Sequence, residues 1–406
     1  MTQNTVSDPT AGGALSDLKV LELGSMLAGP FVGSMLADFG ARVIKVEKPG
    51  KPDALREWPP HKDEVALWWK TMARNKYAIT LDISRPEASE VALKLIGESD
   101  VVIENFRPGT LERWGLSPHE LRERFPRIVW VRVSGWGQTG PNREQGGYAT
   151  IAEAFSGLAS FTGHPDKGPM VSAFPMGDYM AGVFGAFGAL AAIHRRETTG
   201  IGQIVDVALY EPLLRIIESV VVRFDQTGQK KPLLGNQMEE DVPRNVYPTA
   251  DGGSIAISCG SQRIYDGLVD AMGRADLKTD PRFATMADRV VNRHAIDEEV
   301  AAWLVTQNTD EALDMLLKHK VVAGRINDIE DVMSDAHIAA REAIRTVVDE
   351  QLGSMRMPAP VPKLSDTPGS IRWTGRGPGA SNEEIFGEWL GLSRNDIDAL
   401  QRANII

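Results

Sequence analysis

The fold is decided between residues 18 and 47, where the chain reads Leu18-Lys-Val-Leu-Glu-Leu23, Gly24-Ser-Met-Leu-Ala-Gly-Pro30, residues 31–40 and Ala41-Arg-Val-Ile-Lys-Val-Glu47. The first and last of these runs are of β type. Residues 31–39 repeat apolar side chains at helical spacing, and Gly40 is placed to end that helix. A strand, a helix and a strand within about 30 residues form a βαβ unit, whose two strands lie parallel.

The same alternation continues along the chain. Further strands are predicted at 77–82, 100–104, 128–134 and 203–209, and helices at 86–99, from Ser117 onward, and at 210–224. This order predicts an α/β domain with a doubly wound, mostly parallel sheet. Ligands of such sheets bind beyond the carboxyl ends of the strands, so a site is expected in the loops that follow Leu23, Glu47, Glu104 and Ser134.

At 406 residues the chain is long enough for two domains. Residues 1–14 are expected to be a flexible tail. The periodicity lapses between 225 and 243, after which a hairpin-like start and helical stretches over 263–319 predict a smaller α+β domain. A final amphipathic helix is expected near residues 382–390.

The composition excludes several classes of protein. The chain has 44 basic and 55 acidic residues, a net charge of −11, so no basic face for nucleic acid is expected. A single cysteine, Cys259, allows no internal disulfide and no zinc spacing, and the histidines are scattered, so no metal site is expected. We expect no signal peptide at the start of the chain, and the apolar run 180–193 is too short for a membrane span. We therefore expect a cytoplasmic protein without a membrane partner.

One glycine motif fits a dinucleotide-binding pattern but lacks the helix that such a site requires. Gly135-Trp-Gly-Gln-Thr-Gly140 fits the G-x-G-x-x-G pattern and follows a predicted strand. A dinucleotide site requires a helix directly afterwards, but a loop that begins at Pro141 follows instead. We interpret this motif as a structural loop.

Basic side chains gather in the loops named above, namely Arg42, Lys45, Lys48, Arg74, Lys76, Arg107 and Arg113. Each alone is most simply a solvated surface charge. Together, at one edge of the sheet in an acidic protein, they favour a phosphate-rich ligand.

A loop and a helix start meet at Pro175-Met-Gly-Asp-Tyr-Met-Ala-Gly182. Asp178 in this stretch has two interpretations. One is an N-cap or first-turn acid, favourable at the positive end of a helix. The other is a nucleophilic carboxylate that forms covalent intermediates.

Several motifs, in order, resemble one family. They are residues 18–23, Ala28-Gly-Pro30, residues 36–50, Asn75-Lys76, residues 104–109, residues 134–141 and Gly177-Asp178. From Leu18 to the C-terminus the chain resembles class III CoA-transferases, the family of formyl-CoA and carnitine CoA-transferases, which also contains α-methylacyl-CoA racemases.

This resemblance implies a large α/β CoA-binding domain built from residues 15–224 and a return segment 331–406, with a small domain of residues 225–330 between them. It also implies a homodimer of interlocked chains. The substrates would be an acyl-CoA thioester and a free carboxylate, with no permanently bound cofactor. The CoA-binding residues implied are Met26, Ala28, Lys48, Met72, Arg74, Asn75, Lys76, Asn105, Phe106 and Arg113; Leu27, Gly177 and Tyr148 belong to the substrate and oxyanion region.

In the transferases of this family, the aspartate that matches Asp178 attacks the acyl-CoA carbonyl. A mixed anhydride, an aspartyl-CoA thioester and a second anhydride follow, and the acceptor leaves as the new thioester. A helix N-terminus is expected to keep Asp178 ionised, and nearby backbone N–H groups to stabilise the oxyanion.

Tyr148 separates the two branches of the family. Racemases carry a histidine base at this position, and a tyrosine with a pKa near 10 is a poor base at neutral pH. The transferase branch is therefore predicted, although Ala149 stands where transferases commonly have an acid. Residues 235–241 replace the glycine-rich loop of formyl-CoA transferases, which favours another small carboxylate or dicarboxylate. Arg143, Arg244 and Arg325 are candidates for holding a second carboxylate. The alternatives are a racemase and a non-catalytic CoA-ester binding protein.

Overall fold

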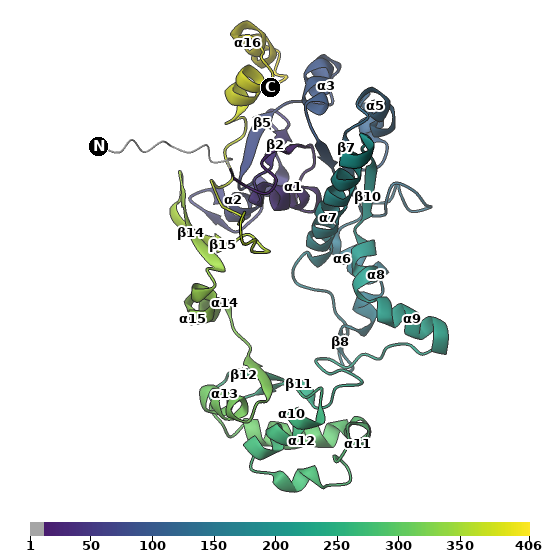
Figure 1. The fold of residues 1–406 in the computed structure, drawn as a ribbon, viewed down its shortest axis with the longest axis vertical. Helices are drawn as coiled ribbons and strands as arrows, with labels where there is room; N and C mark the ends of the chain where they lie inside the picture. The colour runs from purple at the N-terminus through teal and green to yellow at the C-terminus, as the bar shows by residue number, and fades with distance from the viewer. Residues whose placement is uncertain (1–11) are drawn as a thin grey trace, which may run out of the picture. The chain divides into compact units, whose positions relative to one another are not determined.

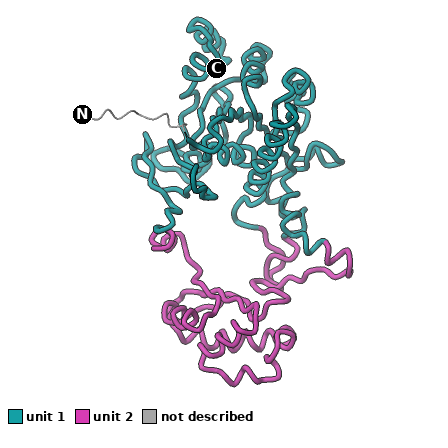
Figure 2. The backbone as a smooth tube through the Cα atoms, viewed as in Figure 1, with its two compact units in different colours: residues 1–158, 172–221, 339–406 teal, residues 159–171, 222–338 magenta. Residues whose placement is uncertain are grey.

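A computed structural model describes residues 12–406, so most of the expected N-terminal tail lies outside the described residues. The chain forms two compact units (Figure 2). The first contains the described residues up to Leu158 together with residues 172–221 and 339–406, and the second contains residues 159–171 and 222–338. These bounds differ from the predicted boundaries at 224/225 and 330/331. No feature of the sequence predicts that residues 159–171 belong to the second unit.

A six-stranded sheet is the centre of the first unit. Its strands are β1 (Lys19–Glu22), β2 (Arg42–Glu47), β5 (Lys76–Thr80), β6 (Val101–Glu104), β7 (Val129–Ser134) and β10 (Ile204–Ala208). Their spatial order is β10-β7-β6-β1-β2-β5, and every neighbouring pair is parallel. The predicted parallel α/β sheet is confirmed.

Helices cover both faces of this sheet (Figure 1). Alternate side chains of a strand point to opposite faces. Val20 and Val43 accordingly pack with α1 (Ala28–Asp38) and α7 (Met176–Thr199), whereas Leu21 and Ile44 pack with α3 (Ser89–Gly97), α5 (Pro118–Arg124) and the C-terminal segment. The strands are therefore apolar on both sides, as expected for a doubly wound sheet.

Helix α7 is the longest element of the structure. Its 24 residues are long and apolar enough to cross a membrane by length and composition. Its glycines instead give close contact with the rest of the first unit. A Cβ at Gly182 would lie 2.8 Å from the Phe31 Cβ, and one at Gly185 would lie 2.8 Å from the Val32 Cγ2. Helix α7 is thus a core helix that packs on α1.

Shorter elements connect these parts of the first unit. They are the 3₁₀ turn at Ala54–Glu57, β3 (His61–Lys62), β4 (Val65–Ala66), α2 (Leu67–Met72), the 3₁₀ turn at Pro86–Ala88, α4 (Thr110–Arg113), α6 (Ala149–Phe155), a 3₁₀ turn at Leu158–Phe161 that crosses into the second unit, α8 (Tyr210–Ile216) and α9 (Glu218–Thr227), which also runs into the second unit. The helix predicted over 210–224 is therefore two helices.

The C-terminal segment departs from its prediction. After the hairpin of β14 (Ile344–Asp349) and β15 (Gly353–Pro358), residues Glu383–Trp389 form a π-helix. The amphipathic α-helix lies later, at α16 (Arg394–Arg402). Its N-terminus is fixed by a capping box between Ser393 and Asp396, a signal that the sequence already contained.

The second unit is an α+β arrangement. An antiparallel sheet of β11 (Arg244–Pro248), β12 (Ser254–Ser258) and β13 (Val322–Arg325) packs with α10 (Gln262–Ala271), α11 (Met286–Val291), α12 (Arg293–Leu304) and α13 (Thr309–Lys318). The remaining elements are β8 (Gly163–His164), β9 (Gly168–Pro169), the 3₁₀ turn at Ala275–Lys278, α14 (Ile329–Ser334) and α15 (Ala336–Ala340), whose last two residues belong to the first unit.

Candidate active site

The strand order places a crevice between β1 and β6. From β1 the chain winds outward through β2 and β5, and from β6 it winds the other way through β7 and β10. Loops diverge at such a switch point, where ligands of α/β sheets bind. A cavity of about 260 Å³ lies there, and Asp178 is part of its wall. It is lined by loops after β1, β6, β7 and β10 and by the start of α7.

The loop after β1 is held in a rigid and unusual shape. Met26 adopts a left-handed φ of 67°, which is rare for a residue other than glycine. Its N–H donates to Asp53 Oδ1 at 3.0 Å. The Asn105 side chain links this loop to the one after β6, since its Nδ2 donates to the Ser25 carbonyl and its Oδ1 accepts from the Ser25 N–H, both at 2.8 Å. Asn105 therefore fixes one wall of the cavity.

A buried set of charges supports this wall from below. The Lys45 ammonium lies 2.7 Å from Asp53 and 3.4 Å from Glu22, and the Lys76 ammonium lies 2.8 Å from Glu22. Lys45 also donates to the Gly24 carbonyl. Burial alone would raise the pKa of Asp53, but the charge of Lys45 holds that pKa below its ordinary value. The two lysines thus neutralise buried carboxylates instead of facing the cavity.

Asp178 lies in the first turn of α7. The N-cap residue is Pro175, and no side-chain hydrogen bond caps the N-terminus of the helix. The first-turn position is confirmed, and the N-cap interpretation is wrong. Burial raises the pKa of Asp178 from 3.8 to about 6. The sequence predicts that the helix N-terminus keeps the pKa of Asp178 low. Desolvation by the surrounding elements outweighs the effect of the helix N-terminus. The carboxyl group is still mostly ionised at pH 7.

Aromatic rings flank Asp178 on one side. The ring of its neighbour Tyr179 stacks on Phe174, with centroids 4.9 Å apart, and its hydroxyl accepts a 2.9 Å hydrogen bond from the Trp68 indole N–H. Trp68 in turn contacts Trp58, which lines the cavity. This apolar flank helps to explain why water stabilises the Asp178 carboxylate poorly.

Helix α6 packs against the start of α7. Tyr148 precedes α6, lines the cavity and is 75% exposed. A Cβ at Gly177 would lie 3.1 Å from the Ala149 Cα, so a larger residue at this position would press on the start of α6. Farther along α6, the buried Glu153 accepts hydrogen bonds from the Ser172 N–H at 2.8 Å and from its hydroxyl at 2.7 Å. Nothing in the sequence singles out Glu153, because its partner Ser172 is 19 residues away.

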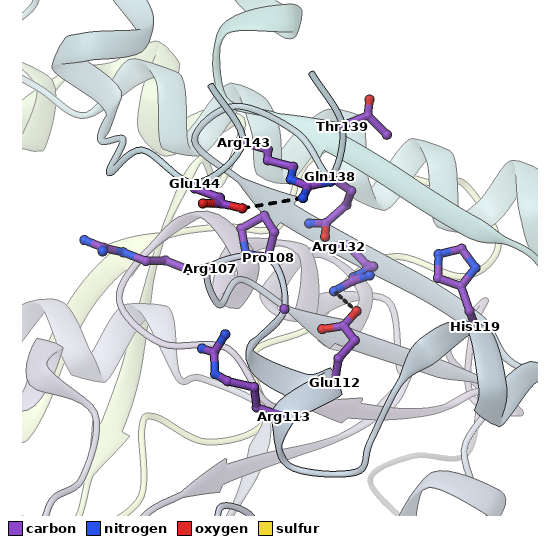
Figure 3. A pocket seen from close by; sticks show the side chains of 11 residues that line it. Arg107, Pro108, Glu112, Arg113, His119, Arg132, Gln138, Thr139, Arg143 and Glu144 are labelled. Carbon is purple, nitrogen blue, oxygen red and sulfur yellow. Dashed lines mark hydrogen bonds and ion pairs between the residues drawn. The ribbon is translucent and has the colours of Figure 1, made fainter. Parts of the chain in front are cut away.

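Half of the predicted site residues come together in one cavity. Met26, Leu27, Ala28, Asn105, Phe106, Tyr148 and Asp178 all line the same cavity. Lys48 and Phe106 line an adjoining cavity of about 290 Å³, where Lys48 pairs with Asp82 at 3.0 Å. Arg113 lines a third cavity of about 600 Å³ (Figure 3). CoA binding by these residues stays a prediction.

Four predicted CoA-binding residues line none of these cavities. Met72 is buried in a small apolar cluster with Leu27. Arg74 pairs with Asp38 and donates to the Pro358 carbonyl, and the Asn75 amide donates to the Ser370 carbonyl. Lys76 pairs with Glu22 and donates to the Pro30 carbonyl at 2.7 Å. Their side chains anchor the first unit internally, so the clustering of basic residues in the sequence overstated the free positive charge.

The candidate arginines separate in the structure. Arg143 lines the Asp178 cavity, whereas Arg244 in β11 and Arg325 in β13 belong to the second unit. The G-x-G-x-x-G motif is a loop, as predicted, because β7 ends at Ser134 and the next helix begins only at Ala149. Within residues 12–406, no group of His, Cys, Asp and Glu side chains is arranged to hold a metal ion.

These features define an α/β protein whose candidate active site is a carboxylate at the switch point of a parallel sheet. The model of CoA-transferase family III matches residues 15–381, and the chain belongs to this family.

Relatives and a solved structure agree with this family. The chain is 44% identical over 393 residues to the succinyl-CoA–D-citramalate CoA-transferase of Chloroflexus aurantiacus, covering 97% of this chain and 98% of the relative. It is 37% identical to the beta subunit of the succinyl-CoA–L-malate CoA-transferase of the same organism, with 100% of both chains covered. A CaiB/BaiF family protein from Brucella suis has the same fold, with a TM-score of 0.83, 30% identity and coverage of 93% of this chain and 99% of that one. The protein is therefore an enzyme of the class III CoA-transferase type, and the predicted transferase branch is confirmed.

Proposed function

We propose that this enzyme moves CoA from succinyl-CoA to a short hydroxydicarboxylate such as citramalate or malate, with Asp178 as the covalent carrier. The observation that carries this proposal is the position of Asp178 in the cavity at the switch point. The substrate class follows the names of the relatives, which act on succinyl-CoA with D-citramalate or L-malate. Tyr148 occupies the position of the racemase base and argues against α-proton exchange.

In the proposed reaction the Asp178 carboxylate attacks the thioester carbonyl and displaces the CoA thiolate, which leaves an acyl-aspartyl anhydride. The thiolate attacks the aspartyl carbonyl of this anhydride, releases succinate and forms an aspartyl-CoA thioester. The acceptor carboxylate then attacks that thioester, and the freed thiolate attacks the acceptor carbonyl of the second anhydride. This last step regenerates Asp178 and releases the new thioester.

Backbone donors are available for the charge that develops in these steps. Ala28 begins α1 and lines the Asp178 cavity, with Leu27 as the N-cap. The first N–H groups of a helix have no partner within the helix, so those of Ala28 and Gly29 are free to donate to an oxyanion. We assign the oxyanion site to this turn, which the Asn105 and Asp53 contacts hold in place.

The experiment is a matrix of acyl-CoA donors and free acids, with product thioesters identified by mass. Succinyl-CoA with citramalate or malate should give transfer, and hydroxylamine or borohydride should trap an adduct on Asp178. Asp178→Ala should abolish both. Full turnover in Asp178→Ala would refute the covalent role. Deuterium exchange from heavy water at the α-carbon without an acceptor acid would favour the racemase, and CoA-ester binding without any transfer would favour a binding protein.

We also propose that two chains form the interlocked homodimer expected of this family. Val183, Phe187 and Leu190 recur at i, i+4 and i+7 on α7, and their side chains are 38%, 70% and 39% exposed within the single chain. An apolar stripe of this kind on a helix needs a partner. Light scattering should give a molecular mass twice that of one chain, and Phe187→Asp should reduce the molecular mass to that of one chain. A wild-type monomer at assay concentration would refute the dimer.

A cytoplasmic location stays a prediction.

A further inference from the structure

Asp178 has no polar contact of its own that fixes the direction of its side chain. Within residues 12–406 its carboxylate forms no ion pair and accepts no hydrogen bond, and burial is the cause of its raised pKa. The side chain therefore follows the backbone of the first turn of α7, where the Asp178 N–H donates to the Pro175 carbonyl at 3.1 Å. Contacts that fix this turn also fix the nucleophile.

Tyr179, the next residue in this turn, is held by three aromatic side chains. Its hydroxyl oxygen accepts a hydrogen bond from the Trp68 indole N–H at 2.9 Å. Its ring stacks on Phe174, with centroids 4.9 Å apart, and meets the ring of Phe31 edge-on at 4.5 Å. Trp68 lies in α2, 111 residues earlier in the chain, and all four side chains belong to the first unit.

The hydrogen bond is the directional contact among these. Aromatic rings pack over a range of angles, whereas a hydrogen bond weakens steeply when its donor angle falls. The close contact between Gly182 and Phe31, one turn farther along, limits the distance between α7 and α1. The bond from Trp68 adds a fixed point for the Tyr179 side chain, and so limits the rotation of the first turn about the helix axis.

Neither partner of this bond is placed to touch the substrate. Trp68 and Tyr179 line neither the Asp178 cavity nor the other two cavities described above. Burial raises the pKa of Tyr179, so its hydroxyl stays neutral at the pH of the reaction. These side chains therefore act on the reaction through the position of Asp178.

We propose that Trp68 and Tyr179 are positioning residues, which hold the Asp178 carboxylate in the direction from which it attacks the thioester carbonyl. This inference rests on the proposed function and adds to it the contact that aligns its nucleophile. Reacting atoms must be aligned at about 3–3.5 Å, and a misplacement of about 1 Å can reduce the rate about 100-fold. A bond that ties α2 to the turn beside the nucleophile is therefore expected to affect the rate.

The test uses Trp68→Phe and Tyr179→Phe in the full-length enzyme, because each removes one partner of the bond and keeps a ring. Transfer from succinyl-CoA to the acid that wild type accepts, citramalate or malate, is followed by product mass. Each variant should lower kcat about 5- to 10-fold with little change in either KM, because alignment is lost while the cavity lining remains. The double variant should be no slower than the slower single variant, since both lose the same bond.

The pH profile separates positioning from desolvation. Both variants keep apolar rings beside Asp178, so the half-maximal pH of kcat/KM should stay near 6 while the rate falls. A half-maximal pH that moves downward in both variants would assign Trp68 and Tyr179 to the desolvation of Asp178 and overturn the positioning role.

Trp373→Phe is the matched control. The Trp373 indole N–H also donates to a partner within the first unit, the Lys76 carbonyl, at 3.0 Å, and its ring also packs on a tyrosine, Tyr77, with centroids 5.2 Å apart. Trp373 packs on the opposite face of the sheet from α7 and lines none of the three cavities. Its variant should leave kcat unchanged.

Three results would overturn the proposal. They are unchanged kcat in Trp68→Phe and Tyr179→Phe, losses that multiply in the double variant, and an equal loss in Trp373→Phe. If Asp178→Ala is inactive in the same assay, such a result leaves the proposed covalent transfer intact. Full turnover in Asp178→Ala would instead refute the proposed function itself.

Discussion

The raised pKa of Asp178 predicts how the reaction depends on pH. The nucleophile is the ionised carboxylate, and burial raises its pKa to about 6. About a tenth of the enzyme is then ionised at pH 5 and about nine tenths at pH 7, so kcat/KM should rise about 10-fold over this interval and level off above it. The direction is fixed: activity increases as pH rises through about 6, because protonation removes the nucleophile.

The assay follows product thioester by chromatography and mass at low acyl-CoA concentration between pH 5 and 8. Intrinsic fluorescence and recovery of activity after return to pH 7 provide the control for unfolding. Trp58→Ala should shift the half-maximal pH downward, because Trp58 lines the cavity and burial is the cause of the raised value. A profile that is flat, falls with rising pH or has its half-point near 4 would refute the reasoning. An unchanged half-point in Trp58→Ala would show that Trp58 does not contribute to the desolvation of Asp178.

Four further variants test the structure. Folding raises the pKa of Asp178 from 3.8 to about 6, so ionisation of this carboxyl destabilises the fold as pH rises from about 4 to about 6. Asp178→Asn should be inactive. In urea it should be up to about 3 kcal/mol more stable than wild type at pH 8 and no more stable at pH 4. Lys45→Met leaves buried carboxylates unpaired and should lower the free energy of unfolding by about 3–5 kcal/mol in the same assay. Gly182→Leu should cost about 1–3 kcal/mol by forcing α7 from α1. Glu153→Ala releases the segment before α7 and should reduce kcat about 10-fold with little change in KM, and Glu153→Gln, which keeps an acceptor, should recover most of it.

Much of the first unit could be predicted because its signals are local. Each strand of the sheet is a short apolar run, and the switch point follows from the order of strands and helices, so the loops after Leu23 and Glu104 were correctly expected at the cavity. The motif around Asp178 was also local. The π-helix at 383–389 was not predictable in this way, because its apolar spacing resembles that of an α-helix.

The features that could not be predicted depend on contacts between residues that are far apart in the sequence. Nothing near Lys76 in the sequence indicates that its ammonium contacts Glu22, 54 residues earlier, instead of a phosphate. The same limit applies to Glu153, whose partner lies on another segment. The pKa of Asp178 was misjudged for a related reason: the helix terminus is visible in the sequence, whereas the desolvation comes from elements that only the fold brings together.

The distribution of charge in the first unit suits the proposed chemistry. Lysines and carboxylates that are close to the crevice pair with one another and brace the loop after β1, and no cation among residues 12–406 pairs with Asp178. A carboxylate that is poorly stabilised as an anion is a more basic nucleophile, and each covalent intermediate of the proposed reaction removes its charge. The low polarity that raises its pKa therefore also favours the anhydride and the thioester over the free anion.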